Sequence, residues 1–162
     1  MTIQTIIQSL EKLVTIHESL LELSEQKTVV IKEGSVEKLQ SLLIKERRYV
    51  RTLGQEEEKR QKKVEDWFSE QRISGKEVTI TTMLNEISGE ETGTEMAQIA
   101  NTLTEVIVKL KQQEQLNQAL IQQSMQFVEL SLDMIDPSIK KMNYGDKHAN
   151  ESANRSVFDS KA

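Results

Sequence analysis

Apolar residues recur every three or four positions along three long stretches of this chain, and glycine and proline rarely interrupt them. Six glycines and one proline among 162 residues are too few breakers for a protein rich in tight turns. Steps of three and four place side chains on one face of a helix. The sequence therefore predicts long helices with narrow apolar stripes.

The first stretch runs from about Thr2 to Glu33, and His17 falls on its apolar seam. The apolar positions of this seam are Ile3, Ile6, Ile7, Leu10, Leu13, Val14, Leu20 and Leu21. Gly34-Ser35 then interrupts the pattern. Because glycine readily takes the left-handed conformation and serine caps helices, this pair predicts the end of one helix and the start of the next.

The second stretch runs from about Val36 to Gln71, with a polar run between Leu53 and Val64. Its predicted seam is Val36, Leu39, Leu43, Val50, Leu53, Val64, Trp67 and Phe68. A basic cluster, Lys45, Arg47, Arg48 and Arg51, suggests a phosphate-binding site. Acidic residues interleave with this cluster, so a solvated helix face is the favoured interpretation.

Residues 73–95 break the helical periodicity, because Gly75, Gly89 and Gly93 occur among many Thr, Ser and Glu residues. The segment 78–87 carries enough apolar residues for a short helix, with Thr79 or Thr81 as its cap. These residues are predicted to be a long connection between two long helices.

The third stretch runs from about Thr94, the predicted N-cap, to Ile135, and Asp136-Pro137 ends it. Its predicted seam is Met96, Ile99, Leu103, Val106, Leu110, Leu120, Phe127 and Met134. Gln113, Glu114 and Asn117 interrupt the apolar pattern, and polar residues on a seam can fix the register of packed helices. One short turn of helix is predicted to follow, over residues 137–142.

The predicted fold is all-α. We expect an elongated antiparallel bundle of three long helices, with a short helix in the 73–95 connection. Residues 143–162 are polar and have no period, which is typical of a disordered tail. The predicted organisation is a helical bundle domain at 1–142 and a flexible C-terminal tail at 143–162.

The composition and motifs indicate a protein that is not an enzyme and needs no cofactor. The absence of cysteine excludes disulfides and thiolate chemistry, and neither His17 nor His148 lies in a metal-ligand spacing, so no metal site is predicted. The net charge of -5 argues against nucleic acid as a partner. No apolar run approaches the ~20 residues of a membrane span, and the N-terminus lacks the pattern of a signal peptide. Membrane insertion is therefore not expected.

The segment 116–135 has more large apolar residues than one narrow stripe needs. Its candidate partner-binding residues are Leu116, Leu120, Phe127, Leu130, Leu132, Met134 and Ile135. For the main-seam residues, a core covered by the first two helices is the favoured interpretation. Leu130 and Leu132 are predicted to lie off that seam, which favours binding another helix, and methionine suits such an adaptable surface.

Four short patterns and their order resemble a known family. They are KEGSVEKLQSLLIKERRYVRTL at 32–53, LNQALI at 116–121, Pro137 followed by Tyr144-Gly145, and a chain end that reads RSVFDSKA. In this organisation the chain is similar to the FlgN family of flagellar type III export chaperones. The resemblance covers nearly the whole chain.

The resemblance implies a cytoplasmic, non-enzymatic chaperone. Such a protein would bind the helical terminal segments of flagellar hook-associated proteins, prevent their premature assembly and deliver them to the export apparatus. It also implies that the C-terminal part binds the client and that Tyr144 docks on the export gate. Two alternatives stay open: a structural coiled coil that forms homo-oligomers through the same stripes, and a helical adaptor unrelated to secretion.

Overall fold

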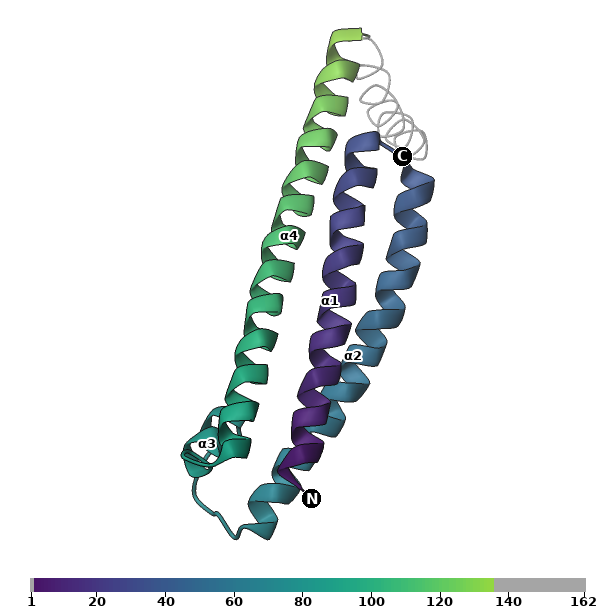
Figure 1. Ribbon diagram of the computed structural model, residues 1–162. Helices are drawn as coiled ribbons and strands as arrows, with labels where there is room; N and C mark the ends of the chain where they lie inside the picture. Colours follow the sequence, from purple (N-terminus) through teal and green to yellow (C-terminus); the bar gives the residue numbers. More distant parts are fainter. Residues whose placement is uncertain (1, 136–162) are drawn as a thin grey trace, which may run out of the picture. The chain divides into compact units, whose positions relative to one another are not determined.

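The computed structural model describes residues 2–135, and all regular structure in that range is helical (Figure 1). The helices are α1 (Ile3–Glu33), α2 (Val36–Glu70), α3 (Ile80–Glu86) and α4 (Glu91–Ile135). This confirms the all-α prediction and the short helix in the 73–95 connection. The predicted stop at Pro137, the turn at 137–142, the tail at 143–162 and Tyr144 lie outside the described residues.

The turn between α1 and α2 forms as Gly34-Ser35 predicts. Gly34 has a φ of 74°, and its N–H donates to the carbonyl of Ile31 at 3.1 Å. The hydroxyl of Ser35 accepts a bond from the backbone N–H of Lys38 at 3.4 Å and so caps α2. Because two residues separate the helices, α1 and α2 run antiparallel and pack along each other.

Helix α4 begins at Glu91, so the prediction that Thr94 is its N-cap is wrong. Gly93 suggested a break, but it lies in the first turn of the helix. A Cβ atom at Gly93 would collide with the carbonyl oxygen of Ile87, which directly follows α3. Glycine is therefore required here for the close approach of two elements. The other cap in this region, Thr79, accepts a bond from the N–H of Thr82 at 3.1 Å, as predicted.

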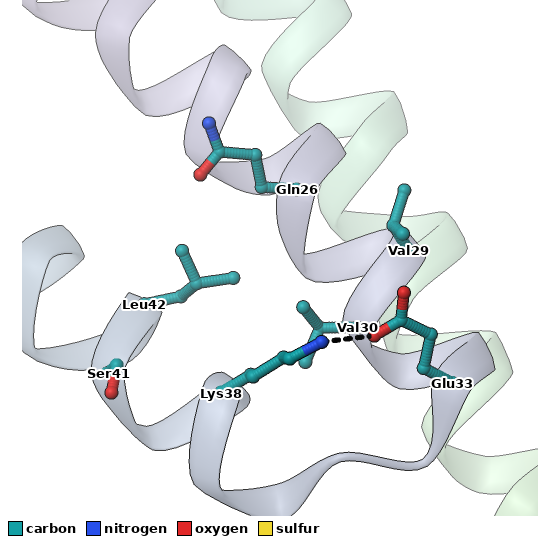
Figure 2. Close-up of a pocket in the computed structure, with 7 residues that line it drawn as sticks. All are labelled: Gln26, Val29, Val30, Glu33, Lys38, Ser41 and Leu42. Atoms are coloured by element: carbon teal, nitrogen blue, oxygen red, sulfur yellow. Dashed lines mark hydrogen bonds and ion pairs between the residues drawn. The ribbon is translucent and has the colours of Figure 1, made fainter.

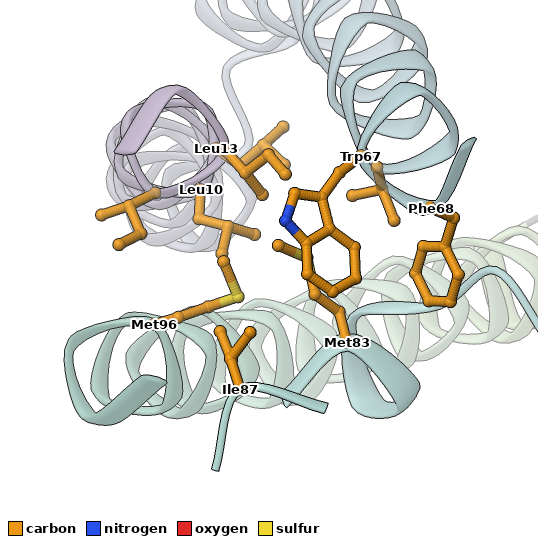
Figure 3. Packing of buried hydrophobic residues seen from close by; sticks show 10 residues of the cluster. Leu10, Leu13, Trp67, Phe68, Met83, Ile87 and Met96 are labelled. Carbon is orange, nitrogen blue, oxygen red and sulfur yellow. The ribbon is translucent and has the colours of Figure 1, made fainter. Parts of the chain in front are cut away.

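The main core joins residues from all four helices (Figure 3). Trp67 and Phe68 meet edge to face, with ring centroids 5.2 Å apart, and Met83 of α3 and Met96 of α4 are fully buried beside them. The buried residues of this cluster, which we call the main core, are Ile6, Ile7, Leu10, Leu13, Val64, Trp67, Phe68, Met83, Ile87 and Met96.

A second, smaller cluster lies nearer the α1–α2 turn and consists of Leu23, Val30 and Leu42. Leu42 was not on the predicted seam of α2, whereas Val36 and Val50, which were, are exposed. The predicted stripe therefore fails at Val36 and Val50 in the first half of α2, whereas Val64, Trp67 and Phe68 in the second half are buried as predicted.

Residues 1–120 form one compact unit, and the boundary with the residues that follow falls inside α4.

Candidate functional site

The last part of α4, residues 121–135, presents large apolar side chains on two sides of the helix. Phe127, Leu130 and Met134, which we call the first stripe, are spaced by three and four residues and have exposed fractions of 71%, 59% and 77%. The second stripe follows the same spacing on another side and is also exposed. It consists of Ile121, Val128, Leu132 and Ile135.

The candidate binding residues divide between these stripes and the preceding part of α4. Leu130 shares a stripe with Phe127 and Met134, so the prediction that it lies off their seam is wrong. Leu132 and Ile135 belong to the second stripe. Within residues 1–120, Leu116 is exposed and Leu120 is half-buried.

Asn117 is buried beside Leu116 and holds α4 to α1 through hydrogen bonds. Its Oδ1 accepts from Thr28 Oγ1 at 2.5 Å, and its Nδ2 donates to the carbonyl of Ser24 at 2.9 Å. Gln113 Nε2 donates to Thr28 Oγ1 at 2.5 Å. These directional bonds are satisfied at one alignment of the two helices, since a shift of either would leave buried polar groups unpaired.

Lys27 connects three helices by charge. Its Nζ lies 2.5 Å from Glu46 Oε2 of α2 and 2.7 Å from Glu114 Oε1 of α4. Burial of the ammonium group lowers the pKa of Lys27, but the hydrogen bonds and charges of Glu114 and Glu46 outweigh burial and leave this pKa raised. Ser24 Oγ also donates to Glu114 Oε1 at 2.7 Å. We call Ser24, Lys27, Thr28, Glu46, Gln113, Glu114 and Asn117 the polar cluster.

Three of the seven residues of this cluster were predicted from the sequence. Gln113, Glu114 and Asn117 were predicted to set register, but their partners on α1 were not found. A signal was present, because Ser24, Lys27 and Thr28 continue the helical spacing of the α1 seam beyond Leu20 as polar residues. Polar residues on two seams can satisfy each other when the helices are packed.

Two of the hollows in residues 2–120 lie between helices. One, of about 430 Å³, lies between α1 and α2 near their turn (Figure 2). Lys38 bonds Glu33 across its mouth at 3.1 Å, while Val30 and Leu42 supply apolar surface. The other, of about 760 Å³, is a groove in which residues of α1, α2, α3 and α4 take part. His17 lines this groove, and its Nδ1–H donates to the carbonyl of Leu13 at 2.7 Å. That bond pairs one ring nitrogen of His17 within α1 itself.

Comparison with known proteins decides the family. The family model described as FlgN protein matches residues 1–152. The chain belongs to the FlgN family. The resemblance seen in the sequence patterns is thereby confirmed.

A relative of this FlgN-family chain is a Bacillus subtilis (strain 168) protein named "Uncharacterized protein YvyG". The two are 33% identical over 165 residues, which covers 100% of each chain. No solved structure matches the chain. The family assignment therefore comes from sequence comparison, and the helical architecture described above comes from this chain itself.

Two properties of the described residues bear on what this FlgN-family chain can do. Within residues 2–135, three or more His, Cys, Asp or Glu side chains nowhere gather in a way that could hold a metal ion. In the same range, no helix is both long enough and apolar enough to cross a bilayer. The features that stand out in this part of the chain are apolar stripes and a polar cluster, which are features of binding and packing.

Proposed function

We propose that this protein is a flagellar export chaperone that binds helical terminal segments of hook-associated proteins. The observation that carries the proposal is the exposure of Phe127, Leu130 and Met134 on one stripe of α4, together with membership of the FlgN family. An aromatic and two flexible aliphatic side chains at helical spacing suit an amphipathic helix, which would bury them against its own apolar face.

The client contact extends to the remaining candidate residues in this proposal. Leu116 and Leu120, in the part of α4 that precedes residue 121, and Leu132 and Ile135 of the second stripe are proposed to contact the client as well. A client segment covered in this way could not self-associate, so its premature assembly would be prevented. Because ordering the partners opposes binding, the complex would remain releasable.

The rest of the proposed function is based on membership of the FlgN family. The chaperone works in the cytoplasm without catalysing a reaction and delivers its client to the type III export apparatus, with Tyr144 as a docking residue. The elongated antiparallel three-helix bundle, and the division into a 1–142 domain and a 143–162 tail, are part of this proposal. One alternative is a structural coiled coil that forms homo-oligomers through the same stripes. The other is a helical adaptor unrelated to secretion.

The test replaces Phe127, Leu130 and Met134 with Ala in the full chain. Binding to a hook-associated protein, measured by isothermal titration calorimetry, is expected to weaken at least about 30-fold, since losing an aromatic anchor alone can cost about 2 kcal/mol. Far-UV circular dichroism should show unchanged helical content. The matched control replaces three other exposed aliphatic residues, Val29, Val78 and Val108, with Ala and should bind normally.

Two results would argue against the proposal. Equal binding by the triple variant and the control would remove the first stripe from the client site. A loss of helical content together with binding would assign these residues to the core. Size-exclusion chromatography separates the first alternative, because a protein that forms only self-complexes in the presence of a hook-associated protein is not its chaperone.

A further inference from the structure

The exposed side of α2 carries a compact positive patch that the function proposed above does not use. Arg47, Arg48 and Arg51 follow Ile44 at spacings of three, four and seven residues, so all four share one face of the helix. Each is exposed, and Ile44 has 53% of its surface accessible. Lys45 lies at the border of this face and is also exposed. We call these five residues the α2 basic patch.

The acidic residues that interleave with this patch in the sequence do not neutralise it. Glu46 turns toward α1 and pairs with Lys27. Glu56 pairs with Lys59 and Glu57 with Arg60, both further along the same helix. Across residues 2–135, no ion pair involves a basic side chain of the patch. The sequence-based interpretation as an evenly mixed, solvated face is therefore incomplete.

The patch is short and has acidic ends. From Ile44 to Arg51 it spans about 10 Å of helix, or two turns. Glu37 and Glu58 lie seven residues before Ile44 and seven after Arg51, on the same face, and both are exposed. An extended polyanion such as a nucleic acid or an anionic membrane would meet these carboxylates, whereas a short acidic segment would fit between them.

We propose that the α2 basic patch binds an acidic amphipathic helix of a partner protein. Arginine guanidinium groups form paired hydrogen bonds with carboxylates, and Arg47 and Arg51 are one helical turn apart, which matches carboxylates four residues apart on a facing helix. Ile44, at one end of the patch, contacts an apolar side chain of that helix. Glu37 and Glu58 accept basic residues at either end of it.

The test uses a synthetic helical peptide with Glu residues spaced by four in its central turns, Leu beside them and Lys at both ends. Binding to the full-length protein is followed by fluorescence anisotropy. The variant R48E/R51E is expected to weaken binding at least about tenfold. The variant K109E/K111E makes the same change of net charge at exposed lysines of α4 and should weaken binding less than about threefold.

Four results would overturn the proposal. The first is that the peptide does not bind the wild-type protein, and the second is that both variants weaken its binding equally. The third is that a peptide with Gln in place of Glu binds equally well. The fourth is that phosphatidylglycerol vesicles or duplex DNA bind more tightly than the peptide and that this binding depends on Arg48 and Arg51. Circular dichroism of both variants confirms that they are folded. A hook-associated protein should still bind R48E/R51E, so failure of this proposal and failure of the chaperone proposal are distinguishable.

Discussion

Replacing Trp67 with Ala is expected to lower the free energy of unfolding by about 3–5 kcal/mol. Trp67 is buried, meets Phe68 edge to face and lies in the main core, to which all four helices contribute. Truncation would leave a cavity bounded by separate helices, and the loss is a large fraction of the stability of an ordinary domain. Urea unfolding followed by far-UV circular dichroism measures it.

The control for this substitution is Tyr49→Ala on the same helix. Tyr49 is exposed, so its truncation should change the free energy of unfolding by less than about 1 kcal/mol. If Trp67→Ala cost no more than Tyr49→Ala, the main core would not hold the four helices together as described.

Replacing Lys27 with Met should have the second largest effect, a loss of about 2–3 kcal/mol. Without the ammonium group, the carboxylates of Glu46 and Glu114 lose their shared cation. Breaking a fully buried ion pair costs about 3–5 kcal/mol, but 44% of the Glu114 side chain is exposed and water screens its charge, so the expected loss is smaller. Adding Glu46→Gln and Glu114→Gln to Lys27→Met should restore most of the stability.

The pH dependence of the free energy of unfolding tests the contribution of the Lys27 charge more directly. Its pKa in the folded protein is raised from the usual 10.5, so the folded state favours the protonated amine. The stabilisation is therefore complete below about pH 10.5 and is lost as the pH rises through the higher, folded-state pKa. The difference in stability between wild type and Lys27→Met should be constant at neutral to mildly alkaline pH and shrink above this value.

The control is Lys38→Met, which removes an exposed ion pair with Glu33 and should cost less than about 1 kcal/mol. A difference between wild type and Lys27→Met that persisted unchanged at strongly alkaline pH would mean that packing of the Lys27 side chain, and not its charge, stabilises the protein.

Local signals predicted the helices and their caps. The end of α1 at Gly34, the cap of α2 at Ser35 and the cap of α3 at Thr79 each depend on conformational or hydrogen-bonding preferences of single residues. The start of α4 depends instead on contact between Gly93 and Ile87, two elements that approach only in the folded chain. A glycine required for close approach looks in the sequence like a glycine that ends a helix.

Helical periodicity predicted an apolar stripe along α2 but did not determine which apolar residues face α1. Leu42 and Leu43 are neighbours, and a small rotation of the helix exchanges which is buried. Leu42 is the buried one, and Val50 turns outward. The same limit applies to the candidate site on α4, where the apolar residues were recognised but Leu130 was assigned to the wrong side.

The polar cluster shows a different limit. Asn117 and Glu114 were recognisable as polar residues on an apolar seam, but their partners are set by how α1 and α4 align. Pairing between helices distant in the sequence depends on tertiary packing, so the spacing within either helix predicts only that some partner exists.

The unequal size of the two apolar clusters has a consequence for how the protein moves. The main core has ten buried residues, Trp67 among them, whereas the second cluster has three, Leu23, Val30 and Leu42, near the α1–α2 turn. Since local opening is governed by how much buried contact must be broken, amide protons around Gly34 should exchange with solvent through fraying, while those beside Trp67 should exchange only through global unfolding. The hairpin tip can then unfold locally while the opposite end of the hairpin stays folded.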